Sequence, residues 1–222
     1  MICISVGEKT VFGCMKALGG TELAEIRLDL LDEKELTPDN VRKLISSGKK
    51  VVATCRPGKM ADARRLELLS SAIDAGAAYV DIEVEAKDGY KEALVKKAKE
   101  KGCEIIISYH DHQRTPSAEE LRQMIAWCFD CGADMAKIAC MVKSDKENAR
   151  LLGLLDSDKR LIVVGMGPEG RITRILAPLL GSEFTFASSG EGKETAEGQL
   201  DKETVARALG ALRKAVGGSG DD

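Results

Sequence analysis

The sequence lacks the features that would place it in a membrane. No apolar run approaches the roughly 20 residues that a membrane-spanning helix needs. The N-terminal segment MICISVGEK has no basic leader followed by a long apolar region, which a secretory signal would show. We therefore expect a cytoplasmic protein.

The sequence also has no large excess of charge of either sign. Its 33 Lys and Arg residues nearly balance 36 Asp and Glu residues, which gives a formal net charge of −3. Nucleic acids and anionic membranes attract basic surfaces, and this balance provides no such field. We expect small molecules or copies of the chain as partners, and no nucleic acid or membrane.

Histidine is scarce, which restricts metal binding. His110 and His112 are the only two, at alternate positions in IIISYHDH. They could form an HxH metal pair, but no third histidine exists and no recognisable carboxylate motif completes a site. We expect no metal and no other cofactor.

The seven cysteines do not indicate a disulfide framework. An odd number spread through apolar segments is typical of reduced thiols. Cys128 and Cys131 form one CxxC motif inside a helical pattern, without a second pair. Two buried cysteines of one helix explain this motif better than a metal or redox site does.

What the sequence does contain is enough apolar residues for a large core. The chain has 222 residues, of which 44% are hydrophobic. No linker rich in Pro, Ser or Gly divides it, and only the C-terminal GGSGDD resembles a frayed tail. We expect a single domain over residues 1–216 and a flexible tail over 217–222.

Short runs rich in β-branched residues alternate with longer helical patterns along the chain. The eight predicted strands cover residues 2–6, 23–30, 50–56, 77–85, 103–110, 133–141, 161–166 and 183–189. The predicted helices start near Val11, Thr37, Ala61, Gly89, Ser117, Asp145, Arg171 and Asp201. Eight such pairs favour an α/β fold, the closed parallel (β/α)8 TIM barrel, for which about 200 residues suffice. An open, doubly wound sheet is the alternative.

Chemically useful side chains fall at the ends of these strands, where such barrels carry their catalytic groups. Lys137 lies in the apolar run DMAKIACM, where an ammonium group is costly unless it is paired or functional. Such a lysine can form a Schiff base with a ketone. His110 follows the fifth predicted strand and Arg56 ends the third.

Two predicted strands carry charged residues at alternate positions. Glu25 and Arg27 share one face of the second strand, so we expect both to point into the barrel mouth. A buried ion pair between them is an alternative. Asp81, Glu83 and Glu85 alternate on the fourth strand, where one could enter the barrel and neutralise an arginine.

The segment GMGPEG, residues 165–170, matches the GxGxxG fingerprint of dinucleotide sites. Too little chain follows it to complete such a domain, so we do not interpret it as an NAD site. In a barrel, glycines after the seventh strand let backbone amides and a helix N-terminus approach an anionic ligand. We interpret the segment as a substrate loop.

Six motifs resemble those of the type I 3-dehydroquinate dehydratases, the lysine-dependent dehydratases of the shikimate pathway. They are ExRxDLL at 25–31, TCR at 54–56, SYHD at 108–111, KIACM at 137–141, MGPEGRITR at 166–174 and TAEGQL at 195–200. Each motif alone is weak, but together, in this order and at barrel spacing, they are specific. The resemblance implies a lyase of aromatic amino acid biosynthesis that is commonly a homodimer.

The resemblance also implies a role for each site residue. Lys137 would form an imine with the C3 ketone of 3-dehydroquinate, and nearby guanidiniums would favour its neutral amine. His110 would be the general base and acid that takes the C2 proton and releases the C1 hydroxyl. Arg174 would bind the substrate carboxylate. The other substrate-binding residues would be Glu25, Arg27, Arg56, Met166, Thr195 and Gln199.

The chain departs from the family pattern at positions near the catalytic histidine. Met60 stands where many members carry a glutamate that orients this histidine, and Asp62, Glu67 or Glu25 could substitute for it. His112 stands where the family usually has an aromatic residue, and a histidine ring can stack in the same way.

The loop around residues 190–198 is rich in glycine and charge, so we expect it to be the lid of the site. Glu197 in this loop replaces a residue that is usually small or proline. Because its carboxylate would repel the carboxylate of a substrate, we expect Glu197 to point outward or the loop to close differently.

Two other functions stay open from the sequence. Another Schiff-base barrel enzyme, such as an aldolase acting on sugar phosphates, would use the same lysine but would offer a phosphate cradle in place of Arg174 and Gln199. The second is a barrel that binds a metabolite without catalysis. The missing glutamate at Met60 is the only feature that suggests it.

Overall fold

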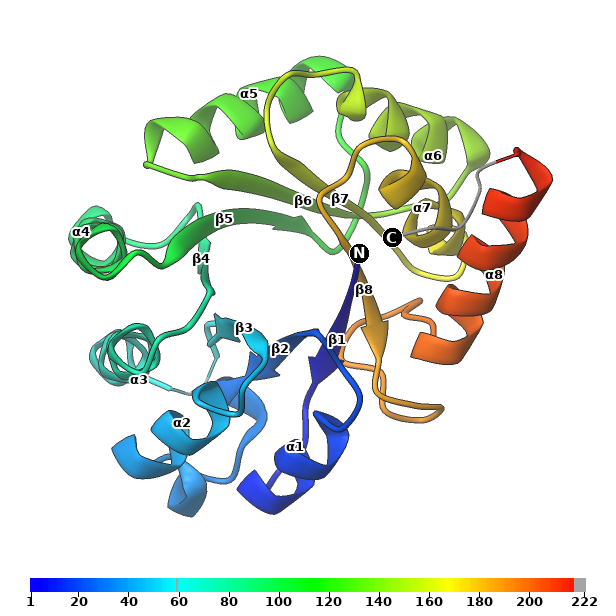
Figure 1. Cartoon of the computed structure of the whole chain (residues 1–222). Coiled ribbons are helices and arrows are strands. Elements are labelled where there is room, and N and C mark those ends of the chain that lie inside the picture. Colours follow the sequence, from blue (N-terminus) through cyan, green and yellow to red (C-terminus); the bar gives the residue numbers. More distant parts are fainter. Residues whose placement is uncertain (59, 218–222) are drawn as a thin grey trace.

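The computed structural model describes residues 1–58 and 60–217, and they form a barrel of parallel strands with helices around it (Figure 1). The strands are β1 (Ile2–Val6), β2 (Leu23–Arg27), β3 (Lys50–Thr54), β4 (Tyr79–Glu83), β5 (Glu104–Asp111), β6 (Met135–Met141), β7 (Leu161–Met166) and β8 (Thr185–Ser188). The helices are α1 (Val11–Ala17), α2 (Pro38–Ile45), α3 (Asp62–Asp74), α4 (Asp88–Lys101), α5 (Ala118–Asp130), α6 (Asp145–Leu152), α7 (Arg171–Leu176) and α8 (Lys202–Ala215). Short 3-10 helices cover Leu28–Leu30, Glu33–Glu35, Gly153–Leu155 and Ala177–Leu179. The predicted (β/α)8 barrel is confirmed, and the open, doubly wound sheet is wrong.

The predicted elements lie close to the observed ones. Each of these eight helices begins within one residue of its predicted start. Five strands (β2, β3, β4, β6 and β8) are shorter than predicted; β2 ends at Arg27, before a 3-10 turn, and β3 ends at Thr54. Arg56 therefore follows its strand instead of ending it. Residues 218–222 of the predicted tail lie outside the described residues.

Several helix starts were predictable because the chain provides their caps. The side chains of Thr10, Thr37, Ser117 and Asp201 each accept a hydrogen bond from the backbone of the helix that follows. At Ser117 the bond is reciprocal, since the side chain of Glu120 accepts from the Ser117 backbone N–H. Such caps satisfy N–H groups that the first turn of a helix leaves unpaired.

Alternation along the strands divides the core into two parts. Outward-facing side chains pack against the helices, and inward-facing ones fill the barrel. The inward series on β2 runs from Leu23 through Glu25 to Arg27, and on β6 from Met135 to Lys137. The barrel interior therefore changes from apolar to charged toward the carboxyl ends of its strands.

Backbone hydrogen bonds between neighbouring strands do not close the barrel completely. Neighbouring strands pair in the order β7 to β1 and then β8, but no ladder joins β7 to β8 within residues 1–58 and 60–217. The Glu183 N–H crosses this seam and donates to the Leu161 carbonyl at 2.9 Å. The guanidinium of Arg174 crosses it again and donates to the Phe186 carbonyl at 3.3 Å. Arg174, which lies on α7 after β7, thus binds the backbone of β8.

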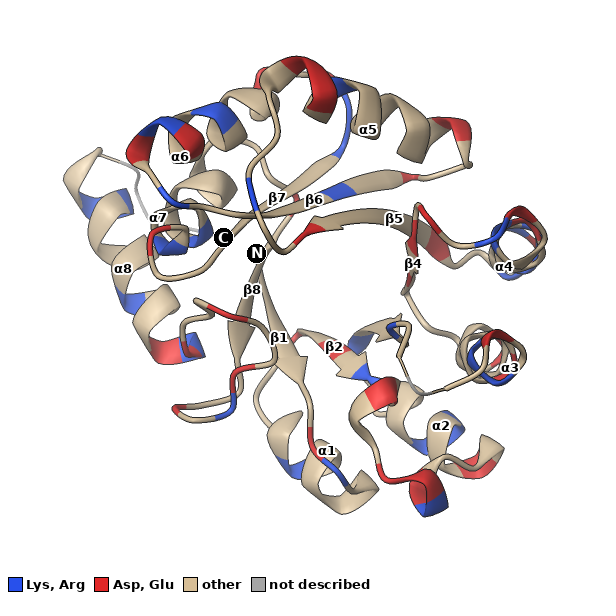
Figure 2. Ribbon diagram, turned by 180° about the vertical axis from the view of Figure 1, so that it is seen from behind, with Lys and Arg blue, Asp and Glu red and all other residues tan. Residues whose placement is uncertain are grey.

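The outer surface carries charges of both signs. Figure 2 shows Lys and Arg residues interspersed with Asp and Glu residues over the outer helices. Among the described helices, none is both long enough and apolar enough to cross a membrane.

A pair of glycine substitutions tests how closely α7 packs on β7. A Cβ added at Gly170 would lie 2.5 Å from the Gly165 carbonyl carbon, whereas one at Gly210 in α8 would meet nothing within 4 Å. We expect Gly170→Ala to destabilise the fold by about 1–3 kcal/mol through overpacking. Gly210→Ala should stabilise it by about 0.5–1 kcal/mol, because alanine favours a helix. Urea unfolding measures both, and a Gly170→Ala protein as stable as the parent would contradict the packing.

Candidate active site

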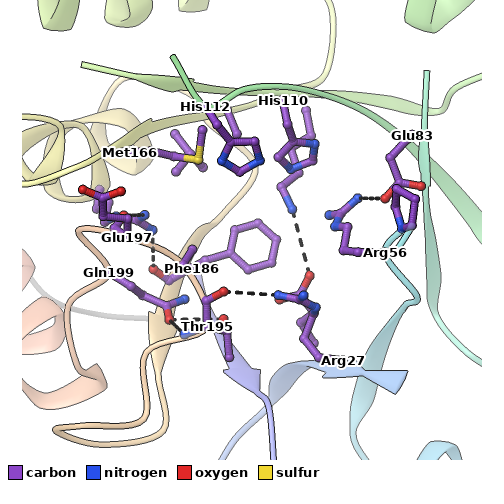
Figure 3. A pocket seen from close by; sticks show the side chains of 17 residues that line it. Arg27, Arg56, Glu83, His110, His112, Met166, Phe186, Thr195, Glu197 and Gln199 are labelled. Carbon is purple, nitrogen blue, oxygen red and sulfur yellow. Dashed lines mark hydrogen bonds and ion pairs between the residues drawn. The ribbon is translucent and has the colours of Figure 1, made fainter. Parts of the chain in front are cut away.

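A cavity of about 310 Å³ opens at the carboxyl ends of the strands (Figure 3). The structure brings every residue predicted for the site to its wall: Glu25, Arg27, Arg56, His110, Lys137, Met166, Arg174, Thr195 and Gln199. Glu83, His112 and Phe186 line it as well. These side chains come from distant parts of the chain, and only the closing of the barrel makes them neighbours.

Lys137 projects from β6 into this cavity and is only 6% exposed. Its ammonium nitrogen donates a hydrogen bond to Asp81 at 3.0 Å and lies 4.0 Å from a carboxylate oxygen of Glu25. The same nitrogen lies 4.1 Å from the centroid of the Phe186 ring. We expected neighbouring guanidiniums to act on this lysine, but the charged groups that contact it are carboxylates.

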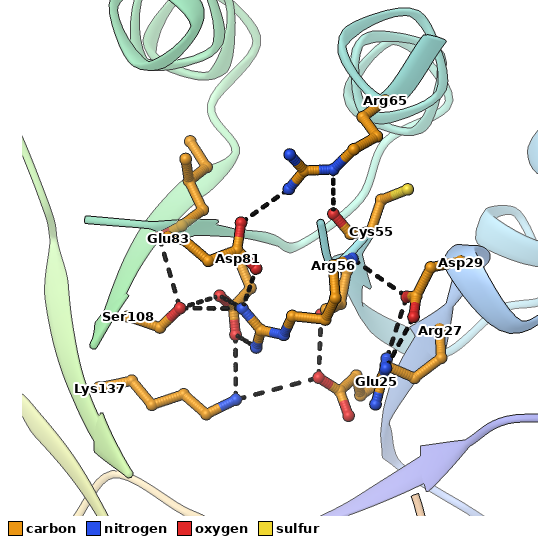
Figure 4. A network of polar contacts seen from close by, with 12 residues as sticks. Glu25, Arg27, Asp29, Cys55, Arg56, Arg65, Asp81, Glu83, Ser108 and Lys137 are labelled. Atoms are coloured by element: carbon orange, nitrogen blue, oxygen red, sulfur yellow. Dashed lines mark hydrogen bonds and ion pairs between the residues drawn. The ribbon is translucent and has the colours of Figure 1, made fainter. Parts of the chain in front are cut away.

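Asp81 on β4 lies between two cations (Figure 4). Its carboxylate accepts two hydrogen bonds from Arg56, at 2.8 and 2.6 Å, and one from Lys137. The hydroxyl of Ser108 also donates to it, at 2.6 Å. Burial opposes its charge, yet Arg56 and Lys137 hold the pKa of Asp81 well below its ordinary value. Asp81 is therefore ionised and holds both cations in place.

The network extends outward through a second carboxylate. Glu83 accepts from Arg56 at 2.7 Å and from Arg65 of α3 at 2.7 Å. Burial disfavours the charge of Arg56, but Asp81 and Glu83 outweigh it and raise the pKa of this guanidinium. We call Arg56, Arg65, Asp81, Glu83 and Lys137 the buried ion network. Two of the three alternating acidic residues of this segment thus enter the barrel, where we expected one.

Glu25 and Arg27 do not pair with each other, so the alternative of a buried ion pair between them is wrong. Arg27 instead forms a two-point ion pair with Asp29, at 3.0 and 2.7 Å. Glu25 accepts hydrogen bonds from the hydroxyls of Ser5 and Thr54. Both residues face the cavity, as the alternation predicted.

His110 lies at the end of β5 beside the stacked ring of His112, with ring centroids 6.2 Å apart and planes 13° apart. No side chain in the described part of the protein forms a hydrogen bond with His110. Burial and the charges of Arg56 and Lys137 lower the pKa of His110 well below 6.5. Its imidazole is therefore neutral near pH 7 and can accept a proton.

None of the three carboxylates expected to replace the missing glutamate does so. Asp62 accepts from Lys87 at 2.9 Å, Glu67 pairs with Arg64, and Glu25 is held as described above. Met60 packs against the outer core. These expectations are wrong because each of the three carboxylates is held by other partners.

Arg174 is 1% exposed and lies against the cavity. It donates to the carbonyls of Phe186 and Glu197, each at 3.3 Å, while its Nε is buried without a partner. No carboxylate of the described residues pairs with it. Burial, with the charge of Arg171, lowers the pKa of Arg174 to about 10. An unpaired buried cation beside a cavity favours an anionic ligand.

The loop after β8 covers one side of the cavity. Thr195 lies within 2.7 Å of the Ser5 hydroxyl, and its backbone N–H donates to the Gln199 side chain at 2.8 Å. Gly198 has a φ of +73°, and a Cβ there would lie 2.1 Å from the Gly167 carbonyl oxygen, so only glycine fits. Glu197 is exposed but also lines the cavity, so the outward position that we expected is not confirmed.

The glycine-rich loop after β7 does not present its amides to a ligand as we interpreted it. The Gly167 N–H donates to the Glu197 carbonyl, the Gly170 N–H to the Gly167 carbonyl, and the Gly165 N–H to the Thr173 hydroxyl. These glycines instead allow β7, α7 and the covering loop to approach one another closely.

The cysteines and the possible metal ligands of the described residues do not form a recognisable site. All seven cysteines are free there, and burial raises the pKa of Cys128 to about 12, with a smaller effect from Cys131. No group of three or more His, Cys, Asp or Glu side chains in the described parts lies close enough together to hold a metal ion.

Sequence reasoning missed part of the site. Asp81 was left without a role, although its alternation with Glu83 is the same signal that identified Glu25 and Arg27. Phe186 gave no signal, since an inward phenylalanine in a strand is typical of a core.

Comparisons with known proteins agree with this geometry. Residues 2–215 match the model of the family described as type I 3-dehydroquinase. The chain is 36% identical over 212 residues to a 3-dehydroquinate dehydratase of Methanococcus maripaludis, covering 90% of this chain and 94% of the relative. It is 34% identical over 218 residues to that of Methanocaldococcus jannaschii, covering 92% and 96%.

A solved structure shares the fold. The 3-dehydroquinate dehydratase of Aquifex aeolicus superimposes with a TM-score of 0.82 at 25% identity, over 96% of this chain and 98% of that one. With the barrel, the cavity and the family match taken together, the chain belongs to the type I 3-dehydroquinase family.

Proposed function

We propose that this protein dehydrates 3-dehydroquinate to 3-dehydroshikimate, as a hydro-lyase of the shikimate pathway, through an imine on Lys137. The observation that carries the proposal is the position of this lysine, which is buried in one cavity with a neutral histidine and an unpaired arginine. The substrate offers a partner for each group: a ketone for the lysine, an acidic proton for the histidine and a carboxylate for the arginine.

The first step is attack on the ketone. The ammonium of Lys137 must lose its proton, and the neutral amine then adds to C3 of the substrate. The resulting carbinolamine loses water and becomes an iminium. Its positive nitrogen accepts the electron pair that the next step releases. Asp81 and Glu25 lie within 4.0 Å of this nitrogen and stabilise its charge.

The second step breaks the C2–H bond and then the C1–O bond. His110 takes the C2 proton, and the electron pair of that bond forms an enamine. The enamine then expels the C1 hydroxyl, which takes the proton back from His110 and leaves as water. Hydrolysis of the new iminium frees Lys137 and 3-dehydroshikimate. The net change is the loss of one water.

The remaining residues hold the substrate. Arg174 provides the cation for the carboxylate, and its planar guanidinium suits two parallel hydrogen bonds. Arg27 and Gln199, with Thr195, line the side of the cavity where the covering loop lies and are placed to bind hydroxyls. Met166 provides an apolar surface for the ring.

The sugar-phosphate aldolase alternative is less well supported. Such an enzyme needs backbone amides that are free to cradle a phosphate, but the N–H groups of Gly167 and Gly170 are used within the protein. A barrel that only binds a metabolite would show no turnover of 3-dehydroquinate, and a steady-state assay decides this point.

Reduction with borohydride in the presence of 3-dehydroquinate tests the nucleophile. We expect one stable adduct, mapped by peptide mass spectrometry to Lys137. Lys91 is an internal control because it is also buried, at 4% exposure, but is absent from the wall of the cavity. Lys137→Ala should remove the adduct and abolish turnover. Activity within tenfold of the parent in this variant would exclude the imine.

His110→Ala should lower the rate about 10²- to 10⁴-fold, because it removes the proton-transfer group, while the imine still forms. His112→Ala removes the other ring of the stack, which contacts His110 but takes no proton, so we expect a smaller loss of rate from it. Because the pKa of His110 is lowered, the base stays neutral and active as the pH falls to 6.5. The acid limb of kcat/KM should therefore lie below pH 6.5, and an acid limb above that value would contradict the assignment.

Arg174→Ala should raise KM about tenfold to hundredfold, because it removes charged hydrogen bonds to the substrate carboxylate. Arg171→Ala provides the control, since this neighbouring arginine on α7 is exposed and absent from the wall of the cavity. Steady-state kinetics with both variants measures the effect. Equal KM values for Arg174→Ala and the parent would remove Arg174 from the carboxylate site.

A further inference from the structure

Within the described residues, Phe186 is the phenylalanine whose ring lies against the side-chain nitrogen of Lys137. It projects inward from β8, is 4% exposed and lines the cavity. The ammonium nitrogen of Lys137 lies 4.1 Å from the centre of its ring. Figure 3 shows this ring in the middle of the pocket, between His110 and the loop that carries Thr195. A distance of this size is well within the range of a cation–π interaction.

The position of the ring is held from two sides. The ring of Phe184 packs edge-on against it, with centroids 5.4 Å apart and planes 68° apart. Tyr79 packs in turn against Phe184, at 5.9 Å. The backbone carbonyl of Phe186 accepts a hydrogen bond from Arg174 across the seam of the barrel. The ring therefore meets the lysine nitrogen in a fixed orientation.

We propose that Phe186 is a catalytic residue whose π face stabilises the positive nitrogen of the Lys137 iminium. The inference rests on the proposed function, because it requires Lys137 to be the nucleophile. It assigns to Phe186 an electrostatic role, in addition to the apolar contact that any large side chain at this position would make.

The nitrogen changes charge during the reaction, so a group that favours the cation acts on particular steps. It is neutral in the carbinolamine and becomes positive when the C3–OH bond breaks, the hydroxyl takes a proton and water leaves. It is neutral again in the enamine and becomes positive when the C1–O bond breaks. The negative π face of the ring stabilises the cation formed in each of these two steps.

The ring complements the carboxylate of Asp81 on another side of the same nitrogen. Asp81 also accepts hydrogen bonds from Arg56 and Ser108, which hold it in place. A carboxylate can also take a proton from the nitrogen, whereas an aromatic ring cannot. Phe186 thus stabilises positive charge without competing as a base.

The burial of Phe186 and Lys137 determines how strongly their interaction affects the rate of dehydration. Both side chains are almost fully buried, and cation–π interactions are strongest when water is excluded. Complete loss of the interaction should lower the rate of dehydration about thirtyfold. Phe186→Leu removes the ring but also opens a cavity, so its effect mixes packing with electrostatics.

Fluorinated phenylalanines separate the two effects. Successive fluorine atoms withdraw charge from the π face while they change the size of the ring little. We would place phenylalanine, 4-fluoro-, 3,5-difluoro- and 3,4,5-trifluorophenylalanine at position 186 of the full chain, and the same series at position 184. Phe184 is the matched control, because it lies in the same barrel core and touches Phe186 but is not stacked on Lys137.

The readouts are the single-turnover rate with 3-dehydroquinate and the fraction of Lys137 trapped by borohydride. We expect the rate to fall with each added fluorine at position 186, by about tenfold or more over the series, and to stay within twofold at position 184, while borohydride still traps the imine in both series. Equal changes of rate in the two series, or no change in either, would overturn the role of Phe186. A parent protein that turns over substrate without any adduct would instead overturn the imine itself, and with it this inference.

Discussion

The structure depends on the neutralisation of charge inside a barrel. A lysine ammonium at the centre of a packed core is costly, and its carboxylate partner would be equally costly alone. The buried ion network resolves this by connecting three cations to Asp81 and Glu83, with Glu25 4.0 Å from the lysine. Removal of Asp81 would leave Lys137 with only Glu25, 4.0 Å away, and breaking a buried ion pair in this way costs about 3–5 kcal/mol.

Arg174 differs from the other cations of the cavity in its partners. Every other cation of the cavity has a carboxylate within about 3 Å, whereas Arg174 meets only carbonyl oxygens among the described residues. The cavity therefore has an unneutralised positive charge at one place, between β7 and β8. The strands do not form a ladder at this seam, and Arg174 donates there to the backbone of β8 and of the covering loop.

The contact that orients His110 is not the one that the family pattern predicts. A carboxylate from the loop after β3 would hold it through a hydrogen bond, but Met60 occupies that loop and packs outward. The stacked ring of His112 is the contact that the structure provides. Stacking restricts the plane of the His110 ring and leaves both of its nitrogens available. Burial, together with the positive charges of Arg56 and Lys137, lowers the pKa of His110 and keeps its ring neutral, which a general base requires.

The sequence by itself determined the order of elements, the barrel, and which residues enter its mouth. These follow from local rules: alternation decides which side of a strand a residue faces, and caps such as Ser117 decide where a helix begins. Only the tertiary structure decided the partners. Arg27 pairs with Asp29 and not with Glu25, Asp81 binds Lys137, and the Phe186 ring lies against the same nitrogen, because these contacts depend on how strands distant in sequence are placed around a closed ring.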